Sequence, residues 1–312
     1  MQMIARERLP FTDPTLTAAG EPRASVTPRA LTTLWLNTGT LCNLTCENCY
    51  IESSPKNDRL EYLLRSDVLA VLSEIEREKL PVVEIGITGG EPFMNPDILH
   101  ILDDCLSAGL NVLVLTNAMR PMMKVADGLI RLNQRYPGQL TLRVSIDHFD
   151  QALHEEERGR RSWRPTLDGL TWLHENGFQL TVAARTRWGE SEQVLRAGFT
   201  RLFSELGLAL AAADPEVLVL FPEMDATAEV PEITTDCWGI LSVDPADMMC
   251  ASARMIVRRR GQPDPEVVAC TLLPYEAEFS LGHTLKESLK PVALNHPHCA
   301  RFCVLGGGSC SG

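Results

Sequence analysis

Three cysteines lie close together near the start of the chain. Cys42, Cys46 and Cys49 have the spacing C-x3-C-x2-C within Leu41–Tyr50. Three thiolates on one short loop can hold three irons of a cubane [4Fe–4S] cluster and leave the fourth iron without a protein ligand. An open metal position is what a site that performs chemistry needs. A zinc knuckle and a chance triple are the alternatives, although zinc sites commonly use two cysteine pairs, and no fourth Cys or His follows closely here.

The composition is that of a folded, acidic protein. Of 312 residues, 45% are hydrophobic and 22% are charged, which suits a globular chain with one large domain or a large and a small one. The net charge of −12 and the lack of a long basic block argue against unspecific nucleic-acid binding. No apolar stretch has the length of a signal peptide core or a membrane span, so we expect a cytoplasmic protein without a membrane partner. Ten cysteines without an export signal favour metal binding over disulfides.

The hydrophobic pattern predicts alternating strands and helices after a flexible N-terminal arm at residues 1–30. Six strands alternating with helices indicate a parallel sheet with right-handed crossovers. Because six units are too few for a closed eight-stranded barrel, we expect an α/β fold with a partial (β/α)6 TIM-like barrel over residues 31–222. Functional residues of such a barrel lie at the C-terminal ends of its strands. The predicted strands are 31–37, 81–88, 111–115, 140–146, 178–185 and 217–221, and the predicted helices are 65–79, 95–108, 122–135, 165–175 and 191–206.

Short polar turns follow the second and third predicted strands. The first turn is Gly89, Gly90, Glu91 and Pro92. Its two glycines allow the backbone to approach a ligand closely, and its carboxylate can pair with an ammonium group. Asn117 ends the third strand, and an ordinary turn asparagine is an equal alternative there.

Charged and polar residues mark the fourth and fifth strands. Arg143, Ser145 and Asp147 alternate along the fourth strand, so their side chains should point to one face. A charge facing the barrel interior is costly unless it is paired. Arg185 and Arg187 end the fifth strand, and either guanidinium can bind a carboxylate as a bidentate fork.

Together, the cysteine loop, the Gly-Gly-Glu-Pro turn at the next strand end and the strand–helix alternation resemble the radical S-adenosylmethionine (SAM) superfamily, from about residue 31 to the end. In that superfamily the amino and carboxylate groups of SAM bind the open iron. Reduction of the cluster cleaves SAM to methionine and a 5′-deoxyadenosyl radical, which abstracts a hydrogen atom from the substrate. The resemblance implies a [4Fe–4S] cluster and SAM as cofactors, and a reductant such as flavodoxin or ferredoxin as a partner.

The resemblance also implies roles for individual residues. The turn Gly89–Pro92 would hold the SAM amino group, and Ser145 or Asp147 would bind the ribose hydroxyls. Arg185 is a candidate for a carboxylate, of SAM or of substrate. Tyr50 is a further candidate for the adenine, because Asn48 stands where many members carry an aromatic, and Phe221-Pro222 would lie beside the adenine. Asn117 resembles a family turn in which Ala118 replaces the usual Gly, and Arg143 would reach the SAM carboxylate or a neighbouring acid. Arg158 is also a candidate, although we expect it to belong to a solvated charge run.

The C-terminal quarter carries a second group of cysteines. A predicted hairpin has Cys250 and Cys270 at its ends, a predicted helix covers 285–289, and Cys299, Cys303 and Cys310 follow. This layout over residues 223–312 resembles the Twitch or SPASM extension of radical SAM enzymes. One auxiliary [4Fe–4S] cluster takes four ligands and two take about eight, so five cysteines favour one cluster. A zinc site on the same residues is the main alternative.

Two further cysteines need separate interpretations. Cys105 lies in the apolar pattern of a helix and is expected to be a buried structural thiol. Cys237 precedes the hairpin, where a hydrogen-atom donor, a cluster ligand or an inert residue are all open interpretations.

The sequence therefore predicts a radical SAM enzyme acting on a small metabolite or cofactor precursor, with the auxiliary cluster either accepting an electron or binding substrate. A radical SAM peptide (RiPP) maturase is the first alternative. It is disfavoured by the short segment before the first strand, which leaves little room for a leader-binding domain. A non-catalytic iron–sulfur or zinc protein is the second alternative.

Overall fold

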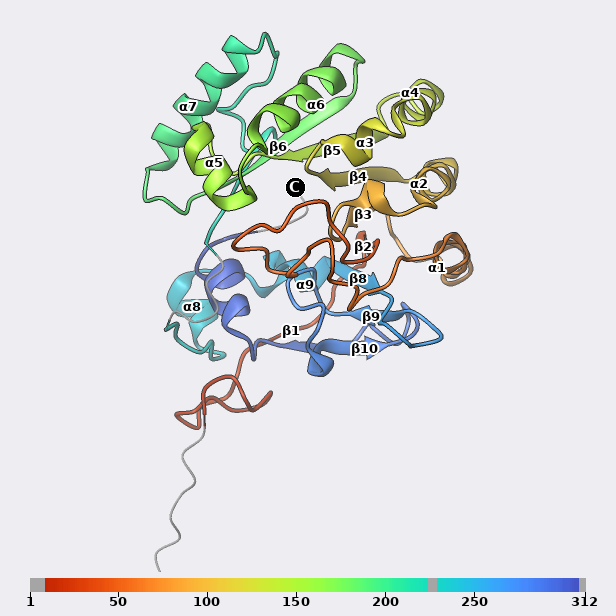
Figure 1. Cartoon of the computed structure of the whole chain (residues 1–312). Helices are drawn as coiled ribbons and strands as arrows, with labels where there is room; N and C mark the ends of the chain where they lie inside the picture. Colours follow the sequence, from red (N-terminus) through yellow and green to blue (C-terminus); the bar gives the residue numbers. More distant parts are fainter. Residues whose placement is uncertain (1–8, 224–228, 309–312) are drawn as a thin grey trace, which may run out of the picture.

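A computed structural model describes residues 9–223 and 229–308 of the chain. Six parallel strands pair in chain order from β2 to β7, as the sequence predicts. They form a partial (β/α)6 barrel, and their C-terminal ends meet at one edge (Figure 1). The strands are β2 Thr33–Asn37, β3 Glu84–Thr88, β4 Asn111–Thr116, β5 Leu140–Ser145, β6 Gln179–Arg185 and β7 Leu218–Phe221.

Helices cover the outer face of this sheet (Figure 1). The predicted helix over 122–135 is two helices, and a further helix occupies the charged segment after β5. The Asp150 side chain starts that helix by accepting the N–H groups of Ala152 and Leu153, and Gly159, with φ 92°, ends it. None of the helices in the described ranges is long and apolar enough to cross a membrane. They are α1 Arg65–Glu78, α2 Ile98–Ser107, α3 Arg120–Met123, α4 Ala126–Arg135, α5 Gln151–Arg158, α6 Trp163–Glu175 and α7 Glu192–Glu205.

The strands bury both faces. In β2, Leu34 and Leu36 join the hydrophobic core between sheet and helices, whereas Trp35 points to the opposite face and packs with the C-terminal segment. Gly86 of β3 lies beside the indole, where a Cβ atom would be 2.4 Å from Cε3 of Trp35. Only glycine fits there without displacing the buried ring.

The C-terminal segment extends the same sheet. Strand β8, Ala253–Val257, pairs in parallel with β2, and the predicted hairpin is confirmed by its antiparallel pairing with β9, Glu266–Val268. The sheet order is β10-β9-β8-β2-β3-β4-β5-β6-β7. One sheet therefore contains strands from before and after residue 222, and the division into two domains at that residue stays a prediction. The remaining elements are η1 Pro92–Met94, α8 Cys237–Leu241, η2 Pro245–Asp247, α9 Met249–Ser252, η3 Ala277–Phe279, β10 Ser280–Gly282, β11 Val292–Ala293 and η4, a π-helix at Cys299–Val304.

The predicted helix at 285–289 is wrong. Residues 285–288 form turns in which the N–H of Ser288 reaches the carbonyls of Thr284 and Leu285. The carboxylate of Glu74 on α1 accepts the N–H groups of Leu285 and Lys286 at 3.1 Å each. Leu285 and Lys286 would be the first residues of the helix, whose N–H groups have no acceptor within it, so Glu74 fastens the turns to α1. The segment does not continue as a helix because the N–H of Leu289 bonds to the carbonyl of Lys286 and that of Lys290 to the carbonyl of Ser288.

The N-terminal segment differs from the predicted flexible arm over its described residues, 9–30. Strand β1, Ser25–Val26, pairs with β11, and the backbone N–H of Ala24 bonds to the carbonyl of Ile233. The Arg23 side chain is fully buried and forms an ion pair with Glu232. This segment is therefore fastened to the C-terminal part by contacts with residues that are remote in sequence. Residues 1–8 lie outside the described ranges.

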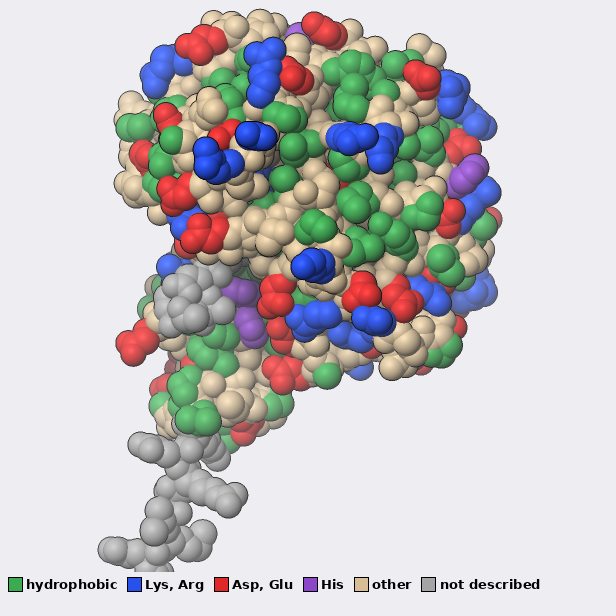
Figure 2. Space-filling model, in the orientation of Figure 1, with side chains coloured by type: hydrophobic (Ala, Val, Ile, Leu, Met, Phe, Trp, Pro, Cys, Tyr) green, Lys and Arg blue, Asp and Glu red, His purple; other side chains and the backbone are tan. Residues whose placement is uncertain are grey.

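On the face shown in Figure 2, acidic and basic side chains are interspersed.

Candidate active site

A cavity opens at the C-terminal ends of the barrel strands. It holds about 1060 Å³ of space that no atom of the chain fills, part of it open to solvent. Most of the residues that the sequence marks as functional line it: Cys42, Cys46, Cys49, Tyr50, Gly89, Gly90, Asn117, Ser145, Asp147, Arg185 and Phe221. Glu91, Pro92, Arg143, Arg187 and Pro222 are not among its lining residues.

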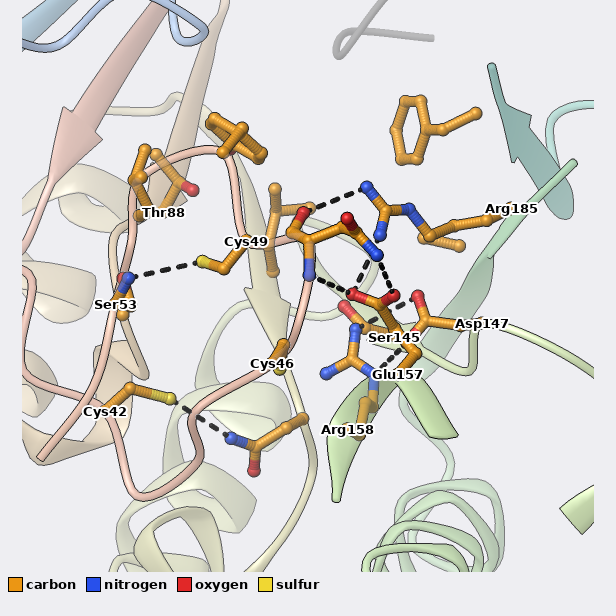
Figure 3. A pocket seen from close by; sticks show the side chains of 18 of the residues that line it. Cys42, Cys46, Cys49, Ser53, Thr88, Ser145, Asp147, Glu157, Arg158 and Arg185 are labelled. Carbon is orange, nitrogen blue, oxygen red and sulfur yellow. Dashed lines mark hydrogen bonds and ion pairs between the residues drawn. The ribbon is translucent and has the colours of Figure 1, made fainter. Parts of the chain in front are cut away.

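The three cysteines of the motif form one side of the cavity (Figure 3). The backbone N–H of Leu44 lies 3.4 Å from Sγ of Cys42, and that of Ser53 lies 3.3 Å from Sγ of Cys49. Burial raises the pKa of Cys42 to about 12 and that of Cys46 to about 11. Without a metal these two thiols stay protonated at neutral pH, so binding of iron must displace protons. Three thiols around one cavity fit a cubane cluster with an open iron.

The two glycines after β3 allow the cysteine loop to lie close to that strand. A Cβ on Gly90 would lie 2.2 Å from the carbonyl oxygen of Leu41. A Cβ on Gly89, which has φ 135°, would lie 2.5 Å from the carbonyl oxygen of Gly39. The N–H of Gly90 donates to the carbonyl of Gly39 at 2.8 Å, and that of Glu91 donates to the carbonyl of Leu41 at 3.1 Å. The sequence predicts that these glycines approach a ligand, whereas in the structure their close contacts are with the backbone of the cysteine loop.

Glu91 is buried behind the cavity wall and fastens the turn after β4. Its carboxylate accepts hydrogen bonds from the Thr116 hydroxyl at 2.8 Å and from the backbone N–H of Asn117 at 2.9 Å. The amide of Asn117 in turn lies 3.9 Å from Sγ of Cys42. Burial raises the pKa of Glu91 to about 7, and these hydrogen bonds partly oppose the rise. Pro92 is buried as the first residue of η1.

Helix α5 contributes an acid that the sequence analysis missed. Glu157 is 2% exposed and forms an ion pair with Arg185 at 2.8 Å (Figure 3). It forms a second ion pair with Arg187 at 2.5 Å. It also accepts two hydrogen bonds from Asn48 in the cysteine loop. The sequence signals for this helix are the capping residue Asp150 before it and Gly159 after it. They are easily overlooked because the residues between them form a run of charges.

Asp147 and Arg158 form a second pair at the cavity. Nε of Arg158 lies 2.5 Å from the Asp147 carboxylate, and both residues line the cavity. The expectation that Arg158 belongs to a solvated charge run is therefore wrong, because its side chain is only 14% exposed. Arg143 lies outside the cavity lining; it donates to the hydroxyl of Thr181 at 3.1 Å, and its charge acts on Glu84.

The C-terminal segment closes part of the cavity. Leu272 and Phe302 line it, and the Phe302 ring stacks on Phe221 with centroids 6.0 Å apart. The hydroxyl of Tyr275 donates to the carbonyl of Ile51 at 2.7 Å, which joins this segment to the cysteine loop. Residues remote in sequence thus cover a site built mainly by the barrel.

Four C-terminal cysteines line a second, apolar cavity. It holds about 340 Å³ of unfilled space among Cys250, Cys270, Cys299 and Cys303. Burial raises the pKa of Cys250 to about 11 and that of Cys299 to about 12. Cys310 lies outside the described residues. Four thiols around such a space fit a four-iron cluster, whereas a zinc ion needs its ligands to meet at one point. Within residues 9–223 and 229–308, no three Cys, His, Asp or Glu side chains are placed to hold a single metal ion.

The two remaining predicted cysteines lie elsewhere. Cys105 is fully buried in the core between sheet and helices, as predicted. Cys237 begins α8, and its sulfur lies 3.4 Å from both the backbone N–H and the hydroxyl of Thr234. It lines neither cavity, so its candidate catalytic role gains no support from its position.

Residues 36–184, which carry the cysteine loop and the ends of β2 to β6, match the Radical SAM superfamily. These residues are a radical SAM domain. Proteins of this superfamily use a [4Fe–4S] cluster and SAM. The cysteines of this chain that supply the cluster motif are the three that line the first cavity.

Curated relatives of the radical SAM domain have diverse names. The chain is 29% identical to the antilisterial bacteriocin subtilosin biosynthesis protein AlbA of Bacillus subtilis over 150 residues, 46% of this chain and 30% of AlbA. It is 26% identical to the GTP 3′,8-cyclase of Rippkaea orientalis over 153 residues, 44% of this chain and 42% of the cyclase. The chain thus spans less than half the length of these relatives.

Among solved structures, Streptococcus suis SuiB bound to S-adenosylmethionine is similar to this chain with a TM-score of 0.59 and 15% identity, over 81% of this chain and 63% of SuiB. SuiB bound to the precursor peptide SuiA gives a TM-score of 0.60 at 15% identity, over 85% of this chain and 64% of SuiB. At this level of identity the similarity concerns the fold.

Proposed function

We propose that the chain is a radical SAM enzyme in which Cys42, Cys46 and Cys49 hold three irons of a [4Fe–4S] cluster and SAM binds the fourth. The observation that carries the proposal is the placement of all three thiols on one cavity at the C-terminal ends of the barrel strands. The radical SAM domain match over residues 36–184 supports it.

When bound, the cluster and SAM supply a 5′-deoxyadenosyl radical that removes a hydrogen atom from the substrate. The residues of the chain bind, orient and exclude water. Asn117 holds the loop at Cys42, and Glu91 fixes Asn117 and is the candidate partner for the SAM ammonium group. Ser145 and Asp147 line the cavity as candidates for the ribose hydroxyls, and Tyr50 as one for the adenine.

Apolar side chains keep water from the reacting centre. Leu115, Phe221, Leu272 and Phe302 line the cavity together with the polar cluster formed by Glu157 and its partners. A dry wall protects a reactive radical from side reactions with solvent. Arg185 and Arg187 share the carboxylate of Glu157. Glu223 lies 4.0 Å from Arg185, and Glu47 and Glu156 each lie 3.7 Å from Arg187. Arg185 would therefore bind a substrate carboxylate only by sharing this pairing.

We also propose an auxiliary [4Fe–4S] cluster bound by four of the five C-terminal cysteines, Cys250, Cys270, Cys299 and Cys303 being the four that share a cavity. Phe302 precedes Cys303, and Leu272 follows Cys270 by two residues, and both apolar side chains reach the first cavity. An auxiliary cluster in this position can accept an electron from a substrate radical or bind the substrate directly.

The substrate is proposed to be a small metabolite or cofactor precursor, with a peptide as the second candidate. The similarity to SuiB bound to a precursor peptide, which extends over 85% of this chain, favours the peptide alternative. SuiB bound to a precursor peptide, AlbA of bacteriocin biosynthesis and the GTP 3′,8-cyclase represent both classes, so both should be offered to the enzyme. A cytoplasmic location and a flavodoxin- or ferredoxin-like reductant remain predictions.

The metal content tests both proposed clusters. Anaerobically reconstituted protein should hold about eight irons and eight sulfides per chain. Replacing Cys42, Cys46 and Cys49 by Ala should leave about four irons, and replacing Cys250 and Cys299 by Ala should also leave about four. Cys105→Ala, in the hydrophobic core, is the control and should keep the full content. Colourless protein that binds zinc instead of iron would contradict the proposal.

A further inference from the structure

Arg254 is a fully buried cation beside the second cysteine cavity. It lies on β8 and is 1% exposed. Its guanidinium donates only to backbone carbonyls: Cys250 at 2.6 Å, Ala253 at 2.7 Å, Ser288 at 3.1 Å and Lys290 at 3.4 Å. Across the described ranges, no Asp or Glu oxygen comes within 4.0 Å of its nitrogens.

Two other buried arginines of this chain are paired with acids. Arg23 pairs with Glu232, and Arg185 pairs with Glu157. A buried charge without an opposite charge is strongly unfavourable, and carbonyl dipoles offset only part of that cost. Arg254 therefore calls for a negative charge that the apoprotein does not provide.

The guanidinium lies against the proposed cluster ligands. Its Nη1 donates to the carbonyl of Cys250 at 2.6 Å, and Cys250 lines the second cavity with Cys270, Cys299 and Cys303. As iron ligands they are thiolates, and a cubane with four thiolates has a net negative charge that grows by one on reduction.

We propose that Arg254 is the charge-compensating residue of the auxiliary cluster and that it favours the reduced form of that cluster. The inference rests on the auxiliary cluster of the proposed function. A guanidinium suits this position because its several N–H groups can donate hydrogen bonds to carbonyls of α9 and of the 284–290 turn at once. It also keeps its positive charge, since arginine is not deprotonated in proteins. Arg254 thus makes the auxiliary cluster a better electron acceptor.

The test uses the full chain with Cys42, Cys46 and Cys49 replaced by Ala, so that only the auxiliary cluster contributes to the spectra. In this background Arg254→Gln removes the charge, and Arg254→Lys keeps it with fewer donors. Arg260→Gln is the control, because Arg260 is 67% exposed and pairs with Asp58 away from the cavity. The midpoint potential is measured by anaerobic titration followed by electron paramagnetic resonance.

Arg254→Gln should make the midpoint potential of the cluster more negative. At a fixed solution potential the ratio of reduced to oxidised cluster should fall at least tenfold, which corresponds to about 59 mV for one electron. Arg254→Lys and Arg260→Gln should shift that ratio less than threefold. Loss of the cluster in Arg254→Gln with retention in Arg254→Lys also supports the proposal. Equal potentials in Arg254→Gln and its parent, or cluster loss in both Arg254 variants, would overturn it. If the triple-alanine parent binds no iron, the auxiliary cluster itself is wrong, which is a separate result.

Discussion

The carboxylate of Glu157 accepts hydrogen bonds from both the backbone N–H and the side-chain amide of Asn48, each at 2.9 Å. The Glu157 carbonyl also accepts the N–H of Glu47 at 2.9 Å. The end of α5 therefore holds the cysteine loop between Cys46 and Cys49. Through Arg185 the same carboxylate joins the loop to the end of β6.

Replacing Glu157 by Gln should destabilise the protein and loosen the cluster loop. Breaking one partner of a buried ion pair costs about 3–5 kcal/mol, because the other charge stays buried. We expect a lower thermal midpoint and a partial loss of iron in the triple-cysteine site. Glu156→Gln is the matched control, since the Glu156 side chain is 46% exposed and lies 3.7 Å from Arg187. Equal thermal midpoints and iron contents in the two variants would show that Glu157 does not hold the cysteine loop.

Gly90→Ala should impair the first cluster without unfolding the barrel. The new methyl group would lie 2.2 Å from the Leu41 carbonyl, so the loop that carries Cys42 must move. We expect fewer irons per chain and slower SAM cleavage, measured by iron analysis and by product formation. Gly239→Ala is the control, because a Cβ on Gly239 meets no atom within 4 Å. Normal iron content in Gly90→Ala would contradict the tight contact.

SAM affinity should depend on pH through Glu91. Burial raises the pKa of this carboxyl to about 7, so it is largely protonated below that pH and ionised above it. The SAM ammonium group would pair with the ionised form, and its dissociation constant should therefore rise as the pH falls below 7, by up to about tenfold per unit. Binding measured between pH 6 and 7.5 in the cluster-loaded protein checks this. Glu91→Gln should flatten the profile, and an unchanged profile in that variant would restrict Glu91 to positioning Asn117.

The ion pair of Arg23 and Glu232 should stabilise the N-terminal segment. The carboxylate of Glu232 also accepts the N–H groups of Phe11 and Ala18 at 2.6 Å each. Glu232→Gln should cost about 3–5 kcal/mol, since the Arg23 side chain is fully buried. The exposed pair of Arg29 and Asp244 is the control, and Arg29→Ala should cost at most about 1 kcal/mol. Protease cleavage within residues 9–30 should quicken only in Glu232→Gln; equal rates would show that the pair does not hold the segment.

The sequence allowed the barrel and the cysteine sites to be predicted because both depend on local patterns. Alternating apolar segments predicted the six parallel strands β2 to β7, although not the parallel pairing of β8 with β2, and cysteine spacing predicted the loop that lines the cavity. Helix α5 was hidden, because Glu157 and Arg158 look like a solvated charge run until the partners Asn48, Arg185 and Asp147 are known. The packing of β1 on β11 was unpredictable for the same reason: its contacts come from distant residues.

The most direct test of the central claim is the formation of 5′-deoxyadenosine. Anaerobically reconstituted protein, given SAM and dithionite, should produce 5′-deoxyadenosine and methionine, detected by mass spectrometry. The variant with Cys42, Cys46 and Cys49 replaced by Ala should produce none, while retaining the iron of the second cavity. Continued SAM cleavage by that variant, or none by the iron-loaded parent, would contradict the account.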